Sequence, residues 1–96
     1  MAAIVNGPRF ELGQVVATPG ALSALEVAKQ VPLELLRRHV RGDWGEVSAE
    51  DAQENNLSVD RGSRVLSAYT LSTEVKIWVL TEADRSSTCI LLPEEY

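Results

Sequence analysis

Three short runs of mainly apolar residues lie in the C-terminal half of the chain. The runs cover residues 64–71, 75–81 and 87–92, and the middle one (VKIWVLT) is rich in β-branched and aromatic residues. The intervening segments, 72–74 and 82–86, have the length of hairpin connections. The pattern therefore predicts an antiparallel three-strand meander, in which 75–81 is the central and best protected strand.

The N-terminal half begins with a further strand pattern. Residues 10–17 (FELGQVVA) place apolar side chains at strand spacing, and Gly13 interrupts them at a position typical of a bulge. Thr18 and Pro19 then form a helix start, because threonine caps exposed N–H groups and proline suits the first helical position. Apolar residues recur at helical spacing through residues 21–30.

Two more helices are predicted before the meander. Pro32 begins the first, whose apolar residues recur at helical spacing up to Val40, and Gly42 is a typical residue just past a helix end. Ser48 begins a second, strongly polar helix over about residues 49–57, which we expect on the surface. A turn is predicted at 60–63.

These elements predict an α+β fold with two or three short helices packed against a small antiparallel sheet. The sheet consists of the C-terminal meander and the N-terminal strand. We expect one domain over residues 10–96, preceded by a loose N-terminal lead-in over residues 1–9. A chain of 96 residues with 45% hydrophobic and 24% charged residues has the size and composition of one globular domain.

The net charge of −5 lies entirely in the second half of the chain. Residues 1–48 are neutral, whereas residues 49–96 carry nine acidic and four basic side chains. An acidic surface is repelled by phosphate backbones, so we expect no direct sequence-specific DNA binding. The negative charge has two interpretations. It suits binding to a host protein or nucleoprotein complex with a basic surface, or it serves only to keep the protein soluble.

Few residues suggest catalytic or metal chemistry. One cysteine, Cys89, and one histidine, His39, exclude an intrachain disulfide and a Cys/His zinc site within one chain. Cys89 in its apolar strand indicates a small core residue, and His39 in a helix indicates a structural histidine. We expect no catalytic residue, metal or cofactor. The sequence shows neither a signal peptide nor an apolar run that would span a membrane, which predicts a cytoplasmic location.

Two loops are candidate partner-binding segments. In the first, Trp44 stands beside Arg41 and Asp43, and Trp and Arg are the residues most enriched at binding hot spots. The alternative is that Trp44 folds back and caps the small core.

The second candidate is the polar hairpin 82–88. It offers Glu82, Asp84 and Arg85, two carboxylates and a guanidinium, to a partner. The alternative is a solvated hairpin tip in which Asp84 and Ser86 bond their own backbone. A cation at this loop is the weakest hypothesis, because calcium requires more oxygen ligands than the loop supplies.

Several blocks of the sequence together resemble a known protein family. They are 13–21 (GQVVATPGA), 38–45 (RHVRGDWG), 81–88 (TEADRSST) and 91–96 (LLPEEY). They resemble a family of short bacterial proteins carried on plasmids, integrative elements and phage-like islands. Its members are labelled plasmid-related proteins or type I restriction subunit M. The resemblance covers about residues 9–96 and supplies no catalytic residue.

The resemblance implies a mobile-element setting, in which small acidic proteins often act on host defence machinery. We therefore expect a non-enzymatic inhibitor of a host defence complex, of the anti-CRISPR or anti-restriction type. An accessory or regulatory module for plasmid or phage maintenance, dimeric through a sheet edge, is the alternative. A small enzyme is the third hypothesis, which the sequence favours least.

Overall fold

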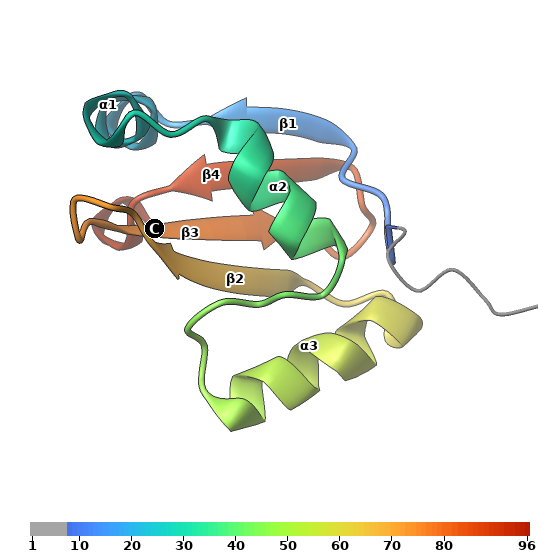
Figure 1. Ribbon diagram of the computed structural model, residues 1–96. Helices are drawn as coiled ribbons and strands as arrows, with labels where there is room; N and C mark the ends of the chain where they lie inside the picture. The colour runs from blue at the N-terminus through green and yellow to red at the C-terminus, as the bar shows by residue number, and fades with distance from the viewer. Residues whose placement is uncertain (1–7) are drawn as a thin grey trace, which may run out of the picture.

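A helical layer and a four-stranded sheet make up the computed structural model, which describes residues 8–96 (Figure 1). Most of the expected lead-in, residues 1–7, lies outside the described residues. The elements in chain order are β1 (Gln14–Ala17), α1 (Pro19–Ala28), α2 (Pro32–Val40), α3 (Ala49–Arg61), β2 (Val65–Thr70), β3 (Lys76–Thr81), β4 (Ser87–Leu91) and the 3₁₀ turn η1 (Pro93–Glu95). The predicted α+β class is confirmed.

The strands are arranged in the order β1-β4-β3-β2. β2, β3 and β4 form the predicted antiparallel meander with β3 at its centre. β1 joins the sheet beside β4, with Gln14 paired to Ser87 and Ala17 to Ile90, and the two strands run parallel. The sheet is therefore mixed rather than wholly antiparallel. Its parallel pair arises because β1 leads into α1 at the end of the sheet where β4 also finishes, as the bond from the Thr18 N–H to the Ile90 carbonyl shows.

The core lies between the helices and one face of the sheet. In Figure 1, α2 crosses this face, α1 lies at its upper left and α3 runs below β2. Alternate residues of each meander strand point to this face, and these inward residues are buried in all three strands. The helices and strands supply its largest apolar members, Leu25, Leu35, Tyr69, Ile77, Val79 and Ile90.

Residues with the opposite alternation point to the face that no helix crosses in Figure 1. Cys89 is one of them, and its half-buried position corrects the prediction of a core cysteine. The reason is strand alternation, since its neighbours Thr88 and Ile90 take the inward positions and are buried. On the same face, Trp78 meets Tyr96 edge to face with ring centroids 5.7 Å apart.

The predicted helix starts are confirmed. The Thr18 hydroxyl accepts from the Ala21 N–H at 3.1 Å, and the Ser48 hydroxyl accepts from the Asp51 N–H at 3.0 Å. α2 begins at Pro32 and is followed by Gly42 at φ +87°, a left-handed conformation that favours glycine. α3, however, continues to Arg61 instead of ending near residue 57.

The extra turn of α3 was missed because its inward positions are polar. Asn55 is 6% exposed and Ser58 is 7% exposed, so two buried residues look like surface residues in the sequence. Gly62 caps the C-terminal end of α3 in a left-handed conformation with φ +75°. The chain therefore turns at the helix end, and not in the separate turn predicted at 60–63.

The two edges of the sheet differ. The β2 edge is occupied by the chain itself: the Ala68 N–H donates to the Trp44 carbonyl at 3.0 Å, and the Glu46 N–H donates to the Ala68 carbonyl at 2.7 Å. The β1 edge presents Val15 and Val16, which are 41% and 44% exposed. One edge is thus blocked and the other faces solvent.

β1 is shorter than the predicted strand 10–17 and starts at Gln14. Gly13, where a bulge was expected, has φ +65° and lies against the β3–β4 connection. A Cβ at this position would stand 2.4 Å from the Arg85 and Ser86 carbonyl oxygens. Glycine is required there because of both its backbone conformation and this close approach.

The C-terminal turn closes over the start of α1. Glu95 accepts a hydrogen bond from the Thr18 hydroxyl at 2.5 Å and another from the Leu92 N–H at 2.8 Å. The carboxylate therefore lies at the positive end of α1, and these hydrogen bonds lower the pKa of Glu95. Residues from the two ends of the domain are joined by this contact.

Candidate functional site

The two loops selected from the sequence meet through a residue that precedes β1. The Phe10 ring stacks on Trp44, with centroids 6.0 Å apart and planes inclined by 20°. The Arg85 guanidinium lies 5.4 Å from the same Phe10 ring. The structure thus places the Arg41–Trp44 loop and the 82–88 hairpin at one end of the sheet, with Phe10 between them.

Trp44 is 5% exposed and caps the core, as in the second interpretation of this residue. Its Nε1 donates to the Asn56 Oδ1 at 3.1 Å, and its ring meets His39 edge to face at 5.8 Å. The Arg9 guanidinium lies 5.8 Å from the ring centroid and donates to the same Asn56 oxygen. An indole enclosed in this way is not an exposed anchor for a partner.

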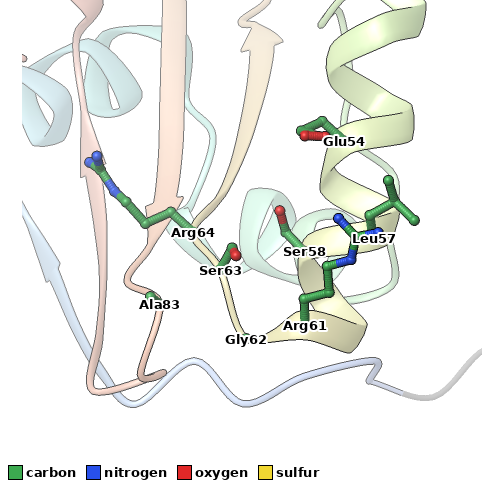
Figure 2. Close-up of a pocket in the computed structure, with 8 residues that line it drawn as sticks. All are labelled: Glu54, Leu57, Ser58, Arg61, Gly62, Ser63, Arg64 and Ala83. Atoms are coloured by element: carbon green, nitrogen blue, oxygen red, sulfur yellow. The ribbon is translucent and has the colours of Figure 1, made fainter.

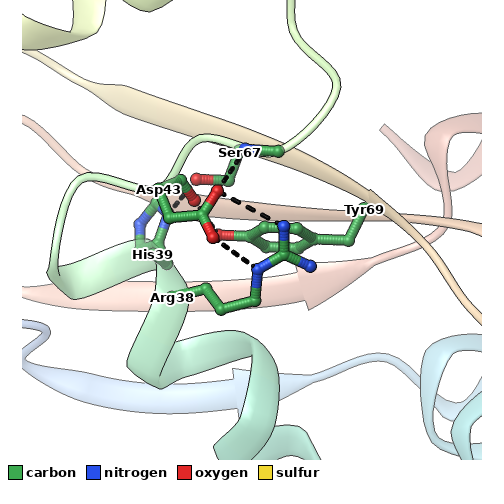
Figure 3. A network of polar contacts seen from close by, with 6 residues as sticks. Arg38, His39, Asp43, Ser67 and Tyr69 are labelled. Carbon is green, nitrogen blue, oxygen red and sulfur yellow. Dashed lines mark hydrogen bonds and ion pairs between the residues drawn. The ribbon is translucent and has the colours of Figure 1, made fainter.

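Asp43 forms an ion pair with Arg38 at the end of α2 (Figure 3). The Arg38 Nε lies 2.7 Å from the Asp43 Oδ2, and its guanidinium covers the Tyr69 ring at 4.5 Å. This hydrogen bond lowers the pKa of Asp43, and the Gly45 N–H bonded to its other oxygen adds to the effect. Arg41, the cap residue that follows α2, is exposed.

Arg85 holds the hairpin against the end of α3. Its guanidinium donates to the carbonyls of Ser63 at 2.6 Å, Ser58 at 2.9 Å and Glu82 at 3.0 Å. Ser58 lies in the last turn of α3, so the cation also compensates the negative end of that helix. A guanidinium committed to three carbonyls of its own chain is a structural clamp.

The two carboxylates of the hairpin differ in their surroundings. Glu82 is half-buried and lies 3.6 Å from the Arg64 Nε. Asp84 is exposed, and its Oδ1 accepts from the Ser86 N–H at 3.0 Å. The backbone bond predicted for Asp84 at the tip is confirmed, and bonding to Ser86 lowers the Asp84 pKa.

A hollow of about 480 Å³ lies between the end of α3 and this hairpin (Figure 2). Leu57, 41% exposed, supplies its largest apolar side chain, and Arg61 and Arg64 are among the other residues that line it. A second shallow hollow of about 460 Å³ continues along α3. Its lining residues are Glu50, Asp51, Gln53, Glu54 and Leu57. The outward face of α3 therefore combines carboxylates with an exposed leucine.

A buried polar chain, missed by the sequence analysis, runs under the helices. The His39 Nδ1 lies 2.6 Å from the Ser67 hydroxyl, and its Nε2 lies 2.9 Å from the Thr81 hydroxyl. Thr81 continues to Thr88 at 2.7 Å, and Thr88 donates to the Leu12 carbonyl at 2.7 Å. The signal in the sequence was the series of hydroxyl residues at inward strand positions.

Burial determines the charge state of this chain. Desolvation lowers the pKa of His39 to about 4, and the nearby Arg85 cation adds to that effect. His39, Ser67, Thr81 and Thr88 are each 0% exposed, so the neutral imidazole and its hydroxyl partners are closed to a substrate. The pairing of His39 with a serine is therefore a structural hydrogen bond.

Within residues 8–96, no three His, Cys, Asp or Glu side chains come close enough together to hold a metal ion. No helix in that part of the chain has the length and apolar character needed to cross a membrane. No protein-family model, curated protein or solved structure matches this chain.

Proposed function

We propose that this protein is a non-enzymatic binding protein that covers a basic surface on a host defence complex and thereby inhibits it. The observation that carries the proposal is the outward face of α3, where Glu50, Asp51 and Glu54 lie around the exposed Leu57. Carboxylates attract a basic surface over distance, and an apolar side chain among them adds contact energy once the surfaces meet.

Three further features support this choice of face. The net charge of −5 comes from the half of the chain that includes α3. The helix is also held rigidly, because its Asn55 side chain is bonded to the Leu66 backbone and the Arg85 guanidinium is bonded to a carbonyl in its final turn. A preorganised acidic helix loses little conformational entropy when it binds. A complex that handles nucleic acid presents a basic surface of the matching kind.

Charge reversal tests the proposal. The variant Glu50→Lys/Glu54→Lys reverses two charges on α3, and Glu26→Lys/Glu34→Lys reverses two on α1 and α2. The pairs are matched, because each contains one acid from the first turn of a helix and one from a later turn. Circular dichroism establishes that both variants fold.

The readout is phage plating on cells that carry a type I restriction enzyme or a CRISPR effector. We expect the wild-type protein and the α1/α2 variant to raise plating efficiency at least tenfold against a susceptible system, and the α3 variant to lose this effect. Wild-type protein that leaves plating unchanged against both defence classes overturns the inhibitor proposal. Equal protection by both variants overturns the assignment to α3.

A further inference from the structure

One edge of the sheet is built to accept another strand. In the parallel pair of β1 and β4, the Gln14 N–H donates to the Ser86 carbonyl and the Thr18 N–H donates to the Ile90 carbonyl. Successive residues of a strand face opposite sides, so Val15 and Ala17 direct their N–H and C=O groups away from β4. Among the hydrogen bonds of residues 8–96, none outside the sheet ladders uses these groups.

The other edge cannot accept a strand in the same way. The backbone of β2 is bonded to the 44–46 segment at Ala68 and to the Asn55 amide at Leu66. A molecule with one free edge forms a closed pair, whereas two free edges would permit an open fibre. The geometry therefore limits edge-to-edge growth to two copies.

Apolar side chains gather on the side of the molecule that carries the free edge. Of the nine exposed large hydrophobic residues in the described part of the chain, 8–96, six fall within residues 15–33: Val15, Val16, Leu22, Val27, Val31 and Leu33. Figure 1 places β1, α1 and the start of α2 along this same side. The edge thus combines unpaired backbone groups with apolar surface, as a strand-addition interface requires.

Charge favours a second copy of the chain as the occupant. Residues 12–25 contain no charged side chain, although the whole protein carries a net charge of −5. Two acidic molecules repel each other least when they approach through this neutral segment. A basic partner is drawn to the carboxylates of α3 instead, so the free edge and the α3 face suit different occupants.

We propose that two copies pair antiparallel through β1 about a two-fold axis at Val16. Val15 then exchanges two backbone hydrogen bonds with the partner's Ala17, and Ala17 does the same with the partner's Val15. Val16 faces the partner's Val16 across the axis at the short spacing of a non-hydrogen-bonded pair. The two four-stranded sheets become one continuous sheet of eight strands.

Sedimentation of the full chain with two matched variants tests the pairing. Val16→Lys puts two like charges face to face at the axis, whereas Val75→Lys changes an exposed valine, 38% exposed, beside β3. We expect the wild-type protein and Val75→Lys to pass from the 10.5 kDa monomer to the dimer between about 10 µM and about 1 mM. Val16→Lys should dimerise at least tenfold more weakly.

Amide hydrogen exchange locates the interface. In the wild-type protein, the N–H groups of Val15 and Ala17 should exchange at least tenfold more slowly at concentrations that favour the dimer. Val16→Lys should remove this concentration dependence. A wild-type protein that stays monomeric, a Val16→Lys protein that dimerises normally, assembly beyond the dimer, or a dimer without protection at Val15 and Ala17 would each overturn the proposal.

Discussion

The side-chain amide of Asn55 forms both backbone hydrogen bonds of Leu66. Its Nδ2 donates to the Leu66 carbonyl at 2.8 Å, and its Oδ1 accepts from the Leu66 N–H at 3.2 Å. A helix side chain thus takes the place that a neighbouring strand would occupy beside β2. This pairing explains how a helix as polar as α3 is fixed to the sheet.

Asn55→Ala should destabilise the fold by about 2 kcal/mol, because it leaves two polar groups of the Leu66 backbone without a partner in a half-buried position. Urea unfolding measures the change. Gln53→Ala, on the exposed side of the same helix, is the matched control and should change stability by less than about 0.5 kcal/mol. Equal effects of the two variants would show that the Asn55 amide contributes nothing to edge pairing.

Trp44→Ala should cost about 3–5 kcal/mol of stability, since the indole is enclosed by Phe10, His39 and Arg9. Trp44→Phe should cost less, because it keeps an aromatic ring and loses the bond to Asn56. Thermal melts of both variants measure the difference. An unchanged melting temperature for Trp44→Ala would contradict the core role of Trp44 and would make it a candidate partner contact again.

His39 should make stability depend on pH between about 4 and about 6.5. Burial lowers its folded-state pKa, so the unfolded chain binds the additional proton in this range. The free energy of unfolding is therefore at its full value above the unfolded-state pKa of His39. It decreases as pH falls toward about 4, by about 3 kcal/mol in total. Urea unfolding of wild type and His39→Gln at pH 7 and pH 5 isolates this effect from the carboxylates. Parallel pH profiles for the two proteins would contradict it.

Thr18→Ala should cost about 1 kcal/mol, because the hydroxyl caps α1 and also donates to Glu95. Thr18→Ser retains both bonds and serves as the control. If the contact acts as one unit, Glu95→Gln should destabilise the wild-type protein more than it destabilises Thr18→Ala. Additive effects in this double-mutant cycle would mean that the cap and the C-terminal turn are independent.

Much of the fold followed from local patterns in the sequence. The apolar-rich runs and short connections of residues 64–92 predicted the meander, and Thr18, Pro32 and Ser48 marked the helix starts. The length of α3 and the parallel β1–β4 pair did not follow. The Asn55 amide is bonded to Leu66 and the Ser58 carbonyl to Arg85, and no local pattern encodes such long-range hydrogen bonds.

The candidate site was less accessible to sequence reasoning. Trp44 and Arg85 were selected because of their residue types, yet one is buried and the other is bonded to three carbonyls. Both side chains lie against Phe10, which is far from each of them in the sequence and between them in the fold. The acidic face of α3 was read only as a solvated surface helix.

The pairing of β1 with β4 has a consequence for synthesis. Thr88 bonds Leu12 and Glu95 accepts from Thr18, across separations of 76 and 77 positions in the chain. β1 therefore has no partner until β4 has left the exit tunnel. Such distant contacts slow folding, and the apolar β1 stays open to other chains in the meantime. Emergence of β4, rather than of the helices made before it, is the event that completes this sheet.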